Sequence, residues 1–456
     1  MSDLIDEWCG IVEPYIDTPK SFIEGAGIFI TSTLLGRFVE CSIMPSKRPN
    51  TWNVISSIPG RARRSSIQSM ADKVIHRALY GYHQHIGLKE IFRSEKKQKA
   101  YDDLDNSAKA QKDKEYQWKA VQLTQIEEGT APGIADRITN MPFKELRLCS
   151  TEMSAVFQKM ALKYNLGVEA LFSKMYYGEP GSILLSGGGG APRMRLIPPN
   201  LYVTMFSGMQ EPKQCITEHM IRQGLLRRMV IDYKPDLSDR WSPPLNLDRK
   251  FVDPKLEKYA DKLLEIMKRL SRLTHEGESK LDLMFFPDVY DSINSYSEKL
   301  DKELDNSPNL TTIYKQSFWE HLAKFSINRR IARFDNKIST LSAFDLTTLM
   351  VEERDYKKSI NYLTPIEKNV PYIIESIGTV EIDMPSRESS IERVYRYIQE
   401  SGVDGILRMK LYRKLGNVLS EDLDKFTKTL VTQGRVCVVP QKDKKGGGVR
   451  YKDVRD

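Results

Sequence analysis

Three stretches with apolar residues at helical spacing follow one another near the C-terminal end of the chain. The first covers residues 389–401, where apolar side chains recur at positions i, i+3 and i+7. The second follows Gly405 and stops at Gly416, and the third begins after Ser420 and ends at Gly434. The apolar positions of these predicted helices are Ile391, Val394, Ile398, Leu407, Leu411, Leu415, Leu423, Phe426, Leu430 and Val431. The pattern predicts a small three-helix core.

A strand, a basic turn and a returning strand follow the third predicted helix. Arg435–Val439 and Val449–Tyr451 are rich in β-branched residues, and Lys442–Gly448 between them combines lysines with three glycines. Three helices followed by a hairpin resemble the winged-helix module of DNA-binding proteins.

In that family the third helix enters the major groove and the hairpin contacts phosphates. The resemblance points to Lys425, Lys428, Lys442, Lys444, Lys445 and Arg450 as DNA-binding residues. Winged helices also serve as adaptors between proteins, and Asp422 and Asp424 on the third helix favour that alternative. DNA contact is the preferred interpretation.

A strand, a basic loop and a helix lie near the start of the chain. Trp52–Ile58 is an apolar run, Pro59–Ser66 is the loop, and a helix with one apolar stripe follows. This is the framework of a phosphate-binding loop, but the pattern G-x-x-x-x-G-K-[ST] is absent. Aligned by its ends, the loop has Ile58 and Arg63 at the glycines, Arg64 at the lysine and Ser65 at the Mg²⁺-binding hydroxyl.

Three interpretations of the loop stay open: a nucleotide site that uses arginines, a site for a nucleic-acid backbone, and a solvated basic turn. The first is preferred, because a helix N-terminus and guanidinium groups both bind phosphate. The predicted nucleotide-binding residues are Gly60, Arg61, Arg63, Arg64, Ser65 and Ser66, with Mg²⁺ held by Ser65 through the nucleotide.

Two further buried strands end in polar residues. Leu146–Glu152 resembles the strand that carries the acidic pair of an ATPase, with Thr151 at the aspartate position and Glu152 as the catalytic carboxylate. The alternative is that Glu152 merely starts the next helix. The second strand, Leu201–Phe206, leads to Gln210, which suits a residue that senses the γ-phosphate.

Two adjacent arginines, Arg227 and Arg228, precede another predicted strand. In ring ATPases an arginine at this place reaches the nucleotide of the neighbouring subunit. A helix-capping or surface role is the alternative. In the later helix, Arg329 and Arg330 are expected on a solvated face, with a sensor arginine as the alternative.

The connecting segments have distinct compositions. Residues 95–119 are charged or polar and predict a projecting helical insertion or a poorly ordered loop. Gly187–Gly190 predicts a flexible hairpin tip beside Arg193 and Arg195. In a ring helicase such a hairpin would follow the DNA backbone, but a flexible surface loop is the preferred interpretation. The apolar periodicity over residues 253–362 predicts a helical lid.

The composition indicates the class of protein and where in the cell it is expected. A hydrophobic content of 40% and a charged content of 29% indicate a globular protein, and no apolar run is long enough to span a membrane. The N-terminus lacks the features of a secretory signal, and the five cysteines are scattered, so a cytoplasmic protein is expected. Of the net charge of +8, residues 389–456 carry +6, with 15 Lys and Arg against 9 Asp and Glu, which favours an anionic partner there.

Over residues 18–235 the order of these motifs resembles an uncharacterised P-loop family of plasmid and viral replication proteins related to AAA+ and MCM-like helicases. The shared segments are Thr18–Phe22, Leu34–Arg37, Pro49–Val54, Glu127–Pro132, Leu146–Glu152, Gln210–Pro212 and Gly224–Arg228. The resemblance implies an αβα ATPase core, ATP and Mg²⁺ as cofactors, DNA as partner and a hexamer-like ring. It assigns phosphate binding to Arg64, catalysis to Glu152, sensing to Gln210 and the arginine finger to Arg228 or Arg227.

The sequence therefore predicts an α/β protein in four parts: a P-loop ATPase-like core (1–245), a helical lid (246–375), a linker (376–388) and a winged helix (389–456). The expected function is that of an oligomeric, ATP-dependent replicative helicase of a mobile element. The alternative is a non-enzymatic DNA-binding initiator or regulator that keeps a degenerate P-loop fold as a scaffold.

Overall fold

The chain forms two compact units, residues 1–379 and 380–456, in the computed structural model. The structure describes residues 3–44, 46–57, 62–86, 103–126, 134, 138, 145–160, 168–185, 193–212, 215–235, 252–274, 279–334, 349–378, 390–402, 405–415, 420–440 and 449–454. The linker predicted at 376–388 lies almost wholly outside these residues. Each unit is treated by itself below.

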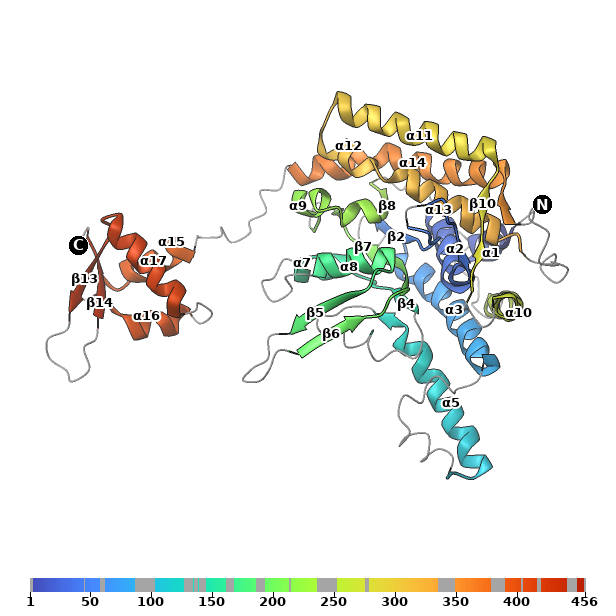
Figure 1. Cartoon of the computed structure of the whole chain (residues 1–456), viewed down its shortest axis with the longest axis horizontal. Coiled ribbons are helices and arrows are strands. Elements are labelled where there is room, and N and C mark those ends of the chain that lie inside the picture. Colours follow the sequence, from blue (N-terminus) through green and yellow to red (C-terminus); the bar gives the residue numbers. More distant parts are fainter. Residues whose placement is uncertain are drawn as a thin grey trace. The chain divides into compact units, whose positions relative to one another are not determined.

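Five parallel strands form the central sheet of the first unit (Figure 1). They are β2 (Trp52–Ser57), β3 (Gln125–Ile126), β4 (Glu145–Leu148), β7 (Tyr202–Met209) and β8 (Val230–Lys234). Their order in the sheet is β3-β4-β7-β2-β8. Parallel strands covered on both faces are continuous apolar runs, and β2 and β7 are buried at every position. The unit is a mixed α/β structure with a central parallel sheet.

The strands predicted at 52–58, 146–152 and 201–206 are present, with different ends. β4 stops at Leu148, four residues before Glu152. β7 continues to Met209, because Ser207 and Gly208 still pair with Val54 and Ile55 of β2. The polar exit from β7 is therefore confined to Gln210 and the residues after it.

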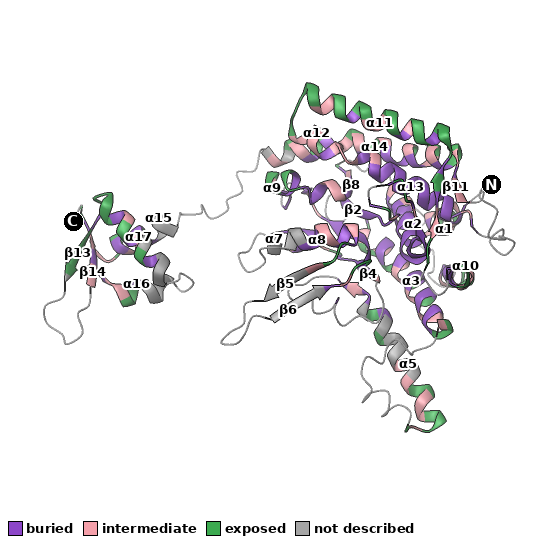
Figure 2. Cartoon of the chain, viewed as in Figure 1, coloured by how far each residue is buried: buried purple, intermediate pink, exposed green. Residues whose placement is uncertain are grey.

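Helices surround this sheet. They are α1 (Leu4–Val12), α2 (Lys20–Leu34), α3 (Arg64–Ile86), α7 (Met153–Met160), α8 (Val168–Tyr177), α9 (Glu218–Arg222), α10 (Asp253–Leu273), α11 (Pro287–Asn306), α12 (Leu310–Lys315), α13 (Phe318–Ile331) and α14 (Glu353–Gly378). The buried helix predicted around residues 25–35 is α2, which is buried along almost its whole length (Figure 2). It packs against both α3 and β7. None of the helices in the described ranges is long and apolar enough to cross a bilayer.

The helical region from α10 to α14 belongs to the same compact unit as the sheet. α10 packs along α3, and α14 contacts β8. Two short parallel pairs help to join the parts: β1 (Val39–Glu40) with β9 (Leu281–Asp282), and β10 (Met284–Phe285) with β11 (Met350–Val351). The predicted lid is thus built into the unit that holds the sheet.

Two elements project from the first unit (Figure 1). One is α5 (Asn106–Leu123), a helix within the charged stretch predicted as an insertion. The other is the antiparallel hairpin of β5 (Gly181–Leu185) and β6 (Arg193–Ile197), whose predicted glycine tip lies outside the described residues.

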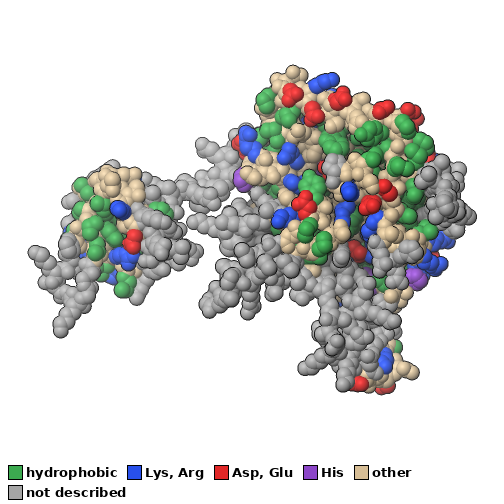
Figure 3. Space-filling view, viewed as in Figure 1, with side chains coloured by type: hydrophobic (Ala, Val, Ile, Leu, Met, Phe, Trp, Pro, Cys, Tyr) green, Lys and Arg blue, Asp and Glu red, His purple; other side chains and the backbone are tan. Residues whose placement is uncertain are grey.

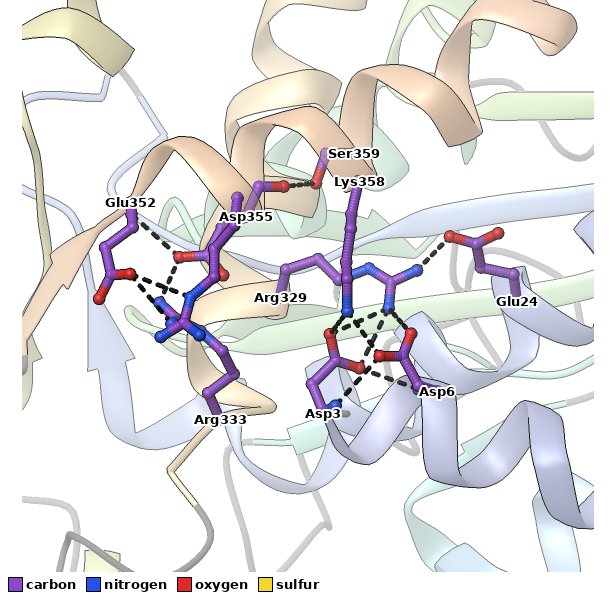
Figure 4. A network of polar contacts seen from close by, with 10 residues as sticks. Asp3, Asp6, Glu24, Arg329, Arg333, Glu352, Asp355, Lys358 and Ser359 are labelled. Atoms are coloured by element: carbon purple, nitrogen blue, oxygen red, sulfur yellow. Dashed lines mark hydrogen bonds and ion pairs between the residues drawn. The ribbon is translucent and has the colours of Figure 1, made fainter. Parts of the chain in front are cut away.

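The N-terminal helix is joined to α13 and α14 by a buried ionic network (Figure 4). Arg329, of which 3% of the side chain is exposed, donates to Asp3 at 3.1 Å and to Asp6 at 3.1 Å, and pairs with Glu24. Lys358 also donates to Asp3, at 2.8 Å. Burial raises the pKa of Asp6, but the hydrogen bond from Lys358 and the charge of Arg329 outweigh this and lower it. The expectation that Arg329 and Arg330 lie on a solvated face was wrong, because α13 is buried on all sides.

The second unit contains three helices and a three-stranded antiparallel sheet. The elements are α15 (Ser390–Gln399), β12 (Ile406–Leu407), α16 (Arg408–Leu415), α17 (Ser420–Thr432), β13 (Val436–Pro440) and β14 (Val449–Asp453). The sheet order is β12-β14-β13. Leu407 was predicted in the second helix but lies in β12, because Ile406 and Leu407 pair with Tyr451 and Arg450. Val394, Ile398 and Leu423 are among the residues of its separate core.

A buried histidine should make the stability of the first unit depend on pH. Burial lowers the pKa of His321 from its ordinary value of 6.5 to about 4, and its Nε2 donates to the Arg227 carbonyl at 2.9 Å. Between pH 6.5 and 4 the unfolded chain binds a proton that the native state does not. We therefore expect the free energy of unfolding to fall by about 3 kcal/mol over this range because of His321 alone.

Urea unfolding followed by tryptophan fluorescence measures this, because all five tryptophans precede residue 379. A His321→Gln variant should lose less stability between pH 6.5 and 4 than the wild type. His85→Gln, at an exposed position of α3, should keep the wild-type dependence. Equal pH dependence in His321→Gln and the wild type would contradict the assignment.

Candidate functional site at the carboxyl edge of the sheet

Three adjacent strands bring the predicted site residues to one edge of the sheet. β4, β7 and β2 are neighbours and parallel, so their carboxyl ends lie on the same side. Glu152 follows β4, Gln210 follows β7, and the basic loop follows β2. In open parallel sheets, ligands bind in the crevice outside this edge.

The end of the basic loop is anchored and enters a long helix. Residues 58–61, which include the predicted Gly60 and Arg61, lie outside the described part of the chain. The buried Ala62 carbonyl accepts a hydrogen bond from Thr18 Oγ1 at 2.6 Å. Arg63 has a left-handed backbone with φ of 44°, a conformation that favours glycine, at the position where the phosphate-loop pattern has glycine. α3 begins at the next residue, Arg64.

Arg64 and Glu152 each hold one buried polar atom that has no partner among the described residues. The Nη1 of the half-buried Arg64 is sealed from solvent and makes no hydrogen bond within the described chain. Burial lowers the pKa of Arg64, while the charge of Glu152 acts in the opposite direction. One oxygen of Glu152 accepts from Gln210 Nε2 at 2.9 Å, and the other, Oε1, is buried with no donor among the described atoms. Within the described part of the chain, Arg64 thus holds a donor and Glu152 an acceptor that no protein group uses.

Gln210 is held in place by the neighbouring strand β2. Ser56 Oγ, near the end of β2, donates to the Gln210 carbonyl at 2.5 Å. The side-chain amide of Gln210 then reaches Glu152. The structure therefore brings together the predicted sensor and the predicted catalytic carboxylate.

A cavity of about 600 Å³ lies mainly along α3 and the start of α10 and reaches this edge at one end; Arg64, Glu152 and Gln210 do not line it. Ser65, which was predicted to bind Mg²⁺, and Thr151, which stands at the aspartate position of the acidic pair, both line it. The remaining lining residues come from α3 and the first turn of α10: Gln68, Ser69, Asp72, Lys73, Val74, His76, Arg77, Asp253, Leu256 and Glu257. Ser65 is exposed and Ser66 half-buried. Within the described residues no group of three or more His, Cys, Asp or Glu side chains is placed to hold a metal ion, so a metal here would depend on oxygens of a bound ligand.

Arg227 and Arg228 lie at the opposite edge of the sheet, because they precede β8. Arg227 donates to Gln316 at 3.0 Å, and the Arg228 guanidinium lies 5.1 Å from the ring centre of Tyr177. Arg228 also donates to the Gly224 carbonyl. The structure does not bring these arginines to Glu152 of the same chain.

The predicted DNA-binding residues are only partly described. Lys428 is exposed on α17, and Arg450 is half-buried on β14. Lys425 lies on α17, and Arg193 and Arg195 lie on β6, but their side chains are outside the description. Lys442, Lys444 and Lys445 are outside it altogether.

Two contacts at these sites were not predicted. Arg408 makes a two-point ion pair with Asp424, at 2.9 and 2.8 Å, which offsets one acidic charge on α17. Gln68 is buried beside the ends of β4 and β7. Gln68 lies three residues before Ala71, among the apolar residues on one face of the predicted helix. A polar residue at such a position is the signal that could have identified it from the sequence.

Comparison with protein-family models finds no matching family, and comparison with curated proteins finds no significantly similar sequence.

Proposed function

We propose that the first unit is a nucleotide-hydrolysing core and that the protein is an ATP-dependent DNA translocase or helicase that works as an oligomer. The observation that carries the proposal is the hydrogen bond between Glu152 and Gln210 at the carboxyl edge of three adjacent strands, where the helix that begins at Arg64 also starts. The strand order supports it as well. β2, first of the five along the chain, lies between the fourth and the fifth, so the basic loop leaves the sheet next to the end of β7, after which Gln210 follows.

The residues divide the work of phosphoryl transfer. ATP with Mg²⁺ supplies the phosphoryl group and the metal charge. Arg64 would offer Nη1, which has no partner among the described residues, to a phosphate oxygen, and Ser65 would offer its hydroxyl to the metal. Glu152 would accept a proton from the attacking water on Oε1, which has no donor in the described chain, while Gln210 holds the other carboxylate oxygen.

The second unit is proposed to be a winged helix that binds DNA. Its element order, helix, strand, helix, helix and hairpin, and its antiparallel sheet support this. The pairing of Asp424 with Arg408 removes one objection, because it offsets that carboxylate near Lys428. In the first unit α11 exposes acidic side chains, which repel DNA (Figure 3). We therefore propose that the first unit contacts DNA through the β5-β6 hairpin.

A ring is proposed from the position of Arg227 and Arg228. Since both lie away from Glu152 of their own chain, a catalytic role requires a neighbouring subunit. A low-resolution image of the particle with ATP and DNA would show a ring under this proposal, and monomers alone would contradict it.

The second candidate is a non-enzymatic DNA-binding initiator or regulator. The observation that favours it is the chemistry of the loop, where Arg64 replaces a lysine and Thr151 replaces an aspartate. An assay of ATP-dependent strand separation on a forked DNA duplex distinguishes the helicase from the non-enzymatic DNA-binding protein. Absence of nucleotide binding at millimolar ATP, with intact DNA binding, would overturn the enzyme and leave the scaffold.

Charge reversal in the hairpin of the second unit gives a prediction for DNA binding. Lys444→Glu with Lys445→Glu should weaken binding of duplex DNA and lower the slope of log K against log salt by about 2, since each lost phosphate contact removes about 0.9. Fluorescence anisotropy over a salt series measures the slope. Lys357→Glu, at an exposed position of α14, is the control and should leave the slope nearly unchanged. Equal slopes in the double variant and the wild type would show that the hairpin does not contact phosphate.

A further inference from the structure

One buried glutamine joins the first turns of α3 to the ends of two strands. Gln68 is 5% exposed, and its amide nitrogen donates to the carbonyls of Ser150 at 3.0 Å and Phe206 at 3.2 Å. Ser150 lies between β4 and Glu152, and Phe206 lies within β7, four residues before Gln210. A single NH₂ group thus bridges the two segments that carry the carboxylate and its partner.

The same place is packed too closely for a side chain on β7. Gly208 donates to the Ser150 carbonyl at 2.8 Å. A Cβ atom on Gly208 would lie 2.8 Å from the Thr151 carbonyl oxygen and 3.3 Å from Gln68 Oε1. The start of α3, the end of β4 and the end of β7 therefore meet at this point, with backbone against backbone.

We infer that Gln68 is a positioning residue for the proposed hydrolytic site. It holds the end of β4 against β7, so that Glu152 and Gln210 stay within the 2.9 Å of their hydrogen bond. Because Gln68 belongs to the helix that begins at Arg64, it also sets the distance between the phosphate side and the carboxylate side of the site. The inference rests on the proposed function, and it assigns a role to a residue outside the phosphate-loop pattern.

The chemistry explains why an amide is needed. Both partners are carbonyl oxygens, so the linking group must supply two donors from one atom, and a primary amide does this without charge. Its other atom, Oε1, is buried with no donor in the described chain, and Gln68 lines the cavity together with Ser65 and Thr151. A carboxylate of the same shape has no donor and would face two carbonyl oxygens.

Amide hydrogen exchange on the full chain tests the bridge without relying on catalysis. Gln68→Met keeps the length of the side chain, and Gln68→Glu keeps its shape; either variant that folds suffices. Exchange should become about tenfold faster at residues 150–152 and 206–210, because the strand ends open more often, and should stay unchanged in β8. Ser69→Ala, the exposed next residue in the same cavity, is the control. Unchanged exchange in both Gln68 variants would overturn the inference.

Steady-state kinetics tests the positioning role. In Gln68→Met, kcat for ATP hydrolysis should fall about 10- to 100-fold with KM within about twofold of the wild type, as expected for a misplaced catalytic group. In a Glu152→Gln background the same substitution should lower the residual rate by less than about twofold, since Gln68 acts through Glu152. The positioning role would be overturned if Gln68→Met lowered kcat equally in the wild-type and Glu152→Gln backgrounds. It would also be overturned if Gln68→Met kept the wild-type kcat although its hydrogen exchange was faster. A wild-type chain that hydrolyses no ATP would refute the proposed function, and hydrogen exchange would still decide whether the bridge exists.

Discussion

Replacing Glu152 by Gln is expected to lower DNA-stimulated ATP hydrolysis by about 100-fold or more, while the affinity for ATP stays within about twofold. The amide keeps the shape of the side chain but cannot accept the proton of an attacking water. Gln210 can still contact the substituted side chain, so the positions of the surrounding groups should change little. Phosphate release measures the first quantity, and binding of a fluorescent ATP analogue measures the second.

Glu211→Gln is the matched control, because Glu211 directly follows Gln210 and is half-buried as well. It should hydrolyse ATP at close to the wild-type rate. A Glu152→Gln variant with wild-type turnover would show that Glu152 is not the proton acceptor, and the interpretation of Glu152 as a residue that simply precedes a helix would replace it. Loss of ATP affinity in Glu152→Gln would instead indicate a role in binding.

This prediction also separates the two candidate functions. A scaffold that only binds DNA has no turnover to lose, so Glu152→Gln would resemble the wild type in every assay. An enzyme that uses Arg64 at the lysine position should bind ATP in the variant and fail to hydrolyse it. A Glu152→Gln variant that binds ATP but does not hydrolyse it would therefore identify the enzyme. Such a variant could also hold a nucleotide-bound ring for imaging.

The elements that carry the proposed site could be predicted from the sequence because each is a local pattern. The apolar run before the basic loop gave β2, and the polar residues after two other buried runs marked Glu152 and Gln210. The left-handed backbone at Arg63 falls where a glycine was expected, although the residue type hides it. Their assignment to one site came from the resemblance in motif order over residues 18–235.

The contacts of the arginines could not be predicted, because they depend on partners far away in the chain. Arg227 meets Gln316 from the end of α12, and Arg329 meets Asp3 and Asp6 from the N-terminal helix. Helical periodicity in a sequence separates the face of a helix that packs on a core from the face that meets water. It fails for α13, because α13 has no water-facing side. A charged residue inside such a helix looks solvated in the sequence and proves to be paired in the structure.

Arg329→Met is expected to lower the free energy of unfolding of the first unit by about 3–5 kcal/mol, the usual cost of removing one partner from a buried ion pair. The substitution keeps most of the buried volume but leaves Asp3, of which 1% of the side chain is exposed, with Lys358 as its remaining cation. Burial raises the pKa of Glu24 even with Arg329 present, so losing the guanidinium should leave that carboxylate still harder to ionise. Urea unfolding with tryptophan fluorescence at neutral pH measures the change.

Arg77→Met provides the control, because Arg77 also pairs with carboxylates, Asp261 and Glu257, but 45% of its side chain is exposed. Its cost should stay below about 1 kcal/mol. Combining Arg329→Met with Glu24→Gln should cost less than the sum of the single changes, because the second substitution removes a charge that the first leaves unpaired. If Arg329→Met costs no more than Arg77→Met, the buried network does not stabilise the fold. The attachment of the N-terminal helix then rests on its other contacts, such as the packing of Trp8 and Ile5 against Gly27 of α2 and the hydrogen bond from Trp8 to the Ile23 carbonyl.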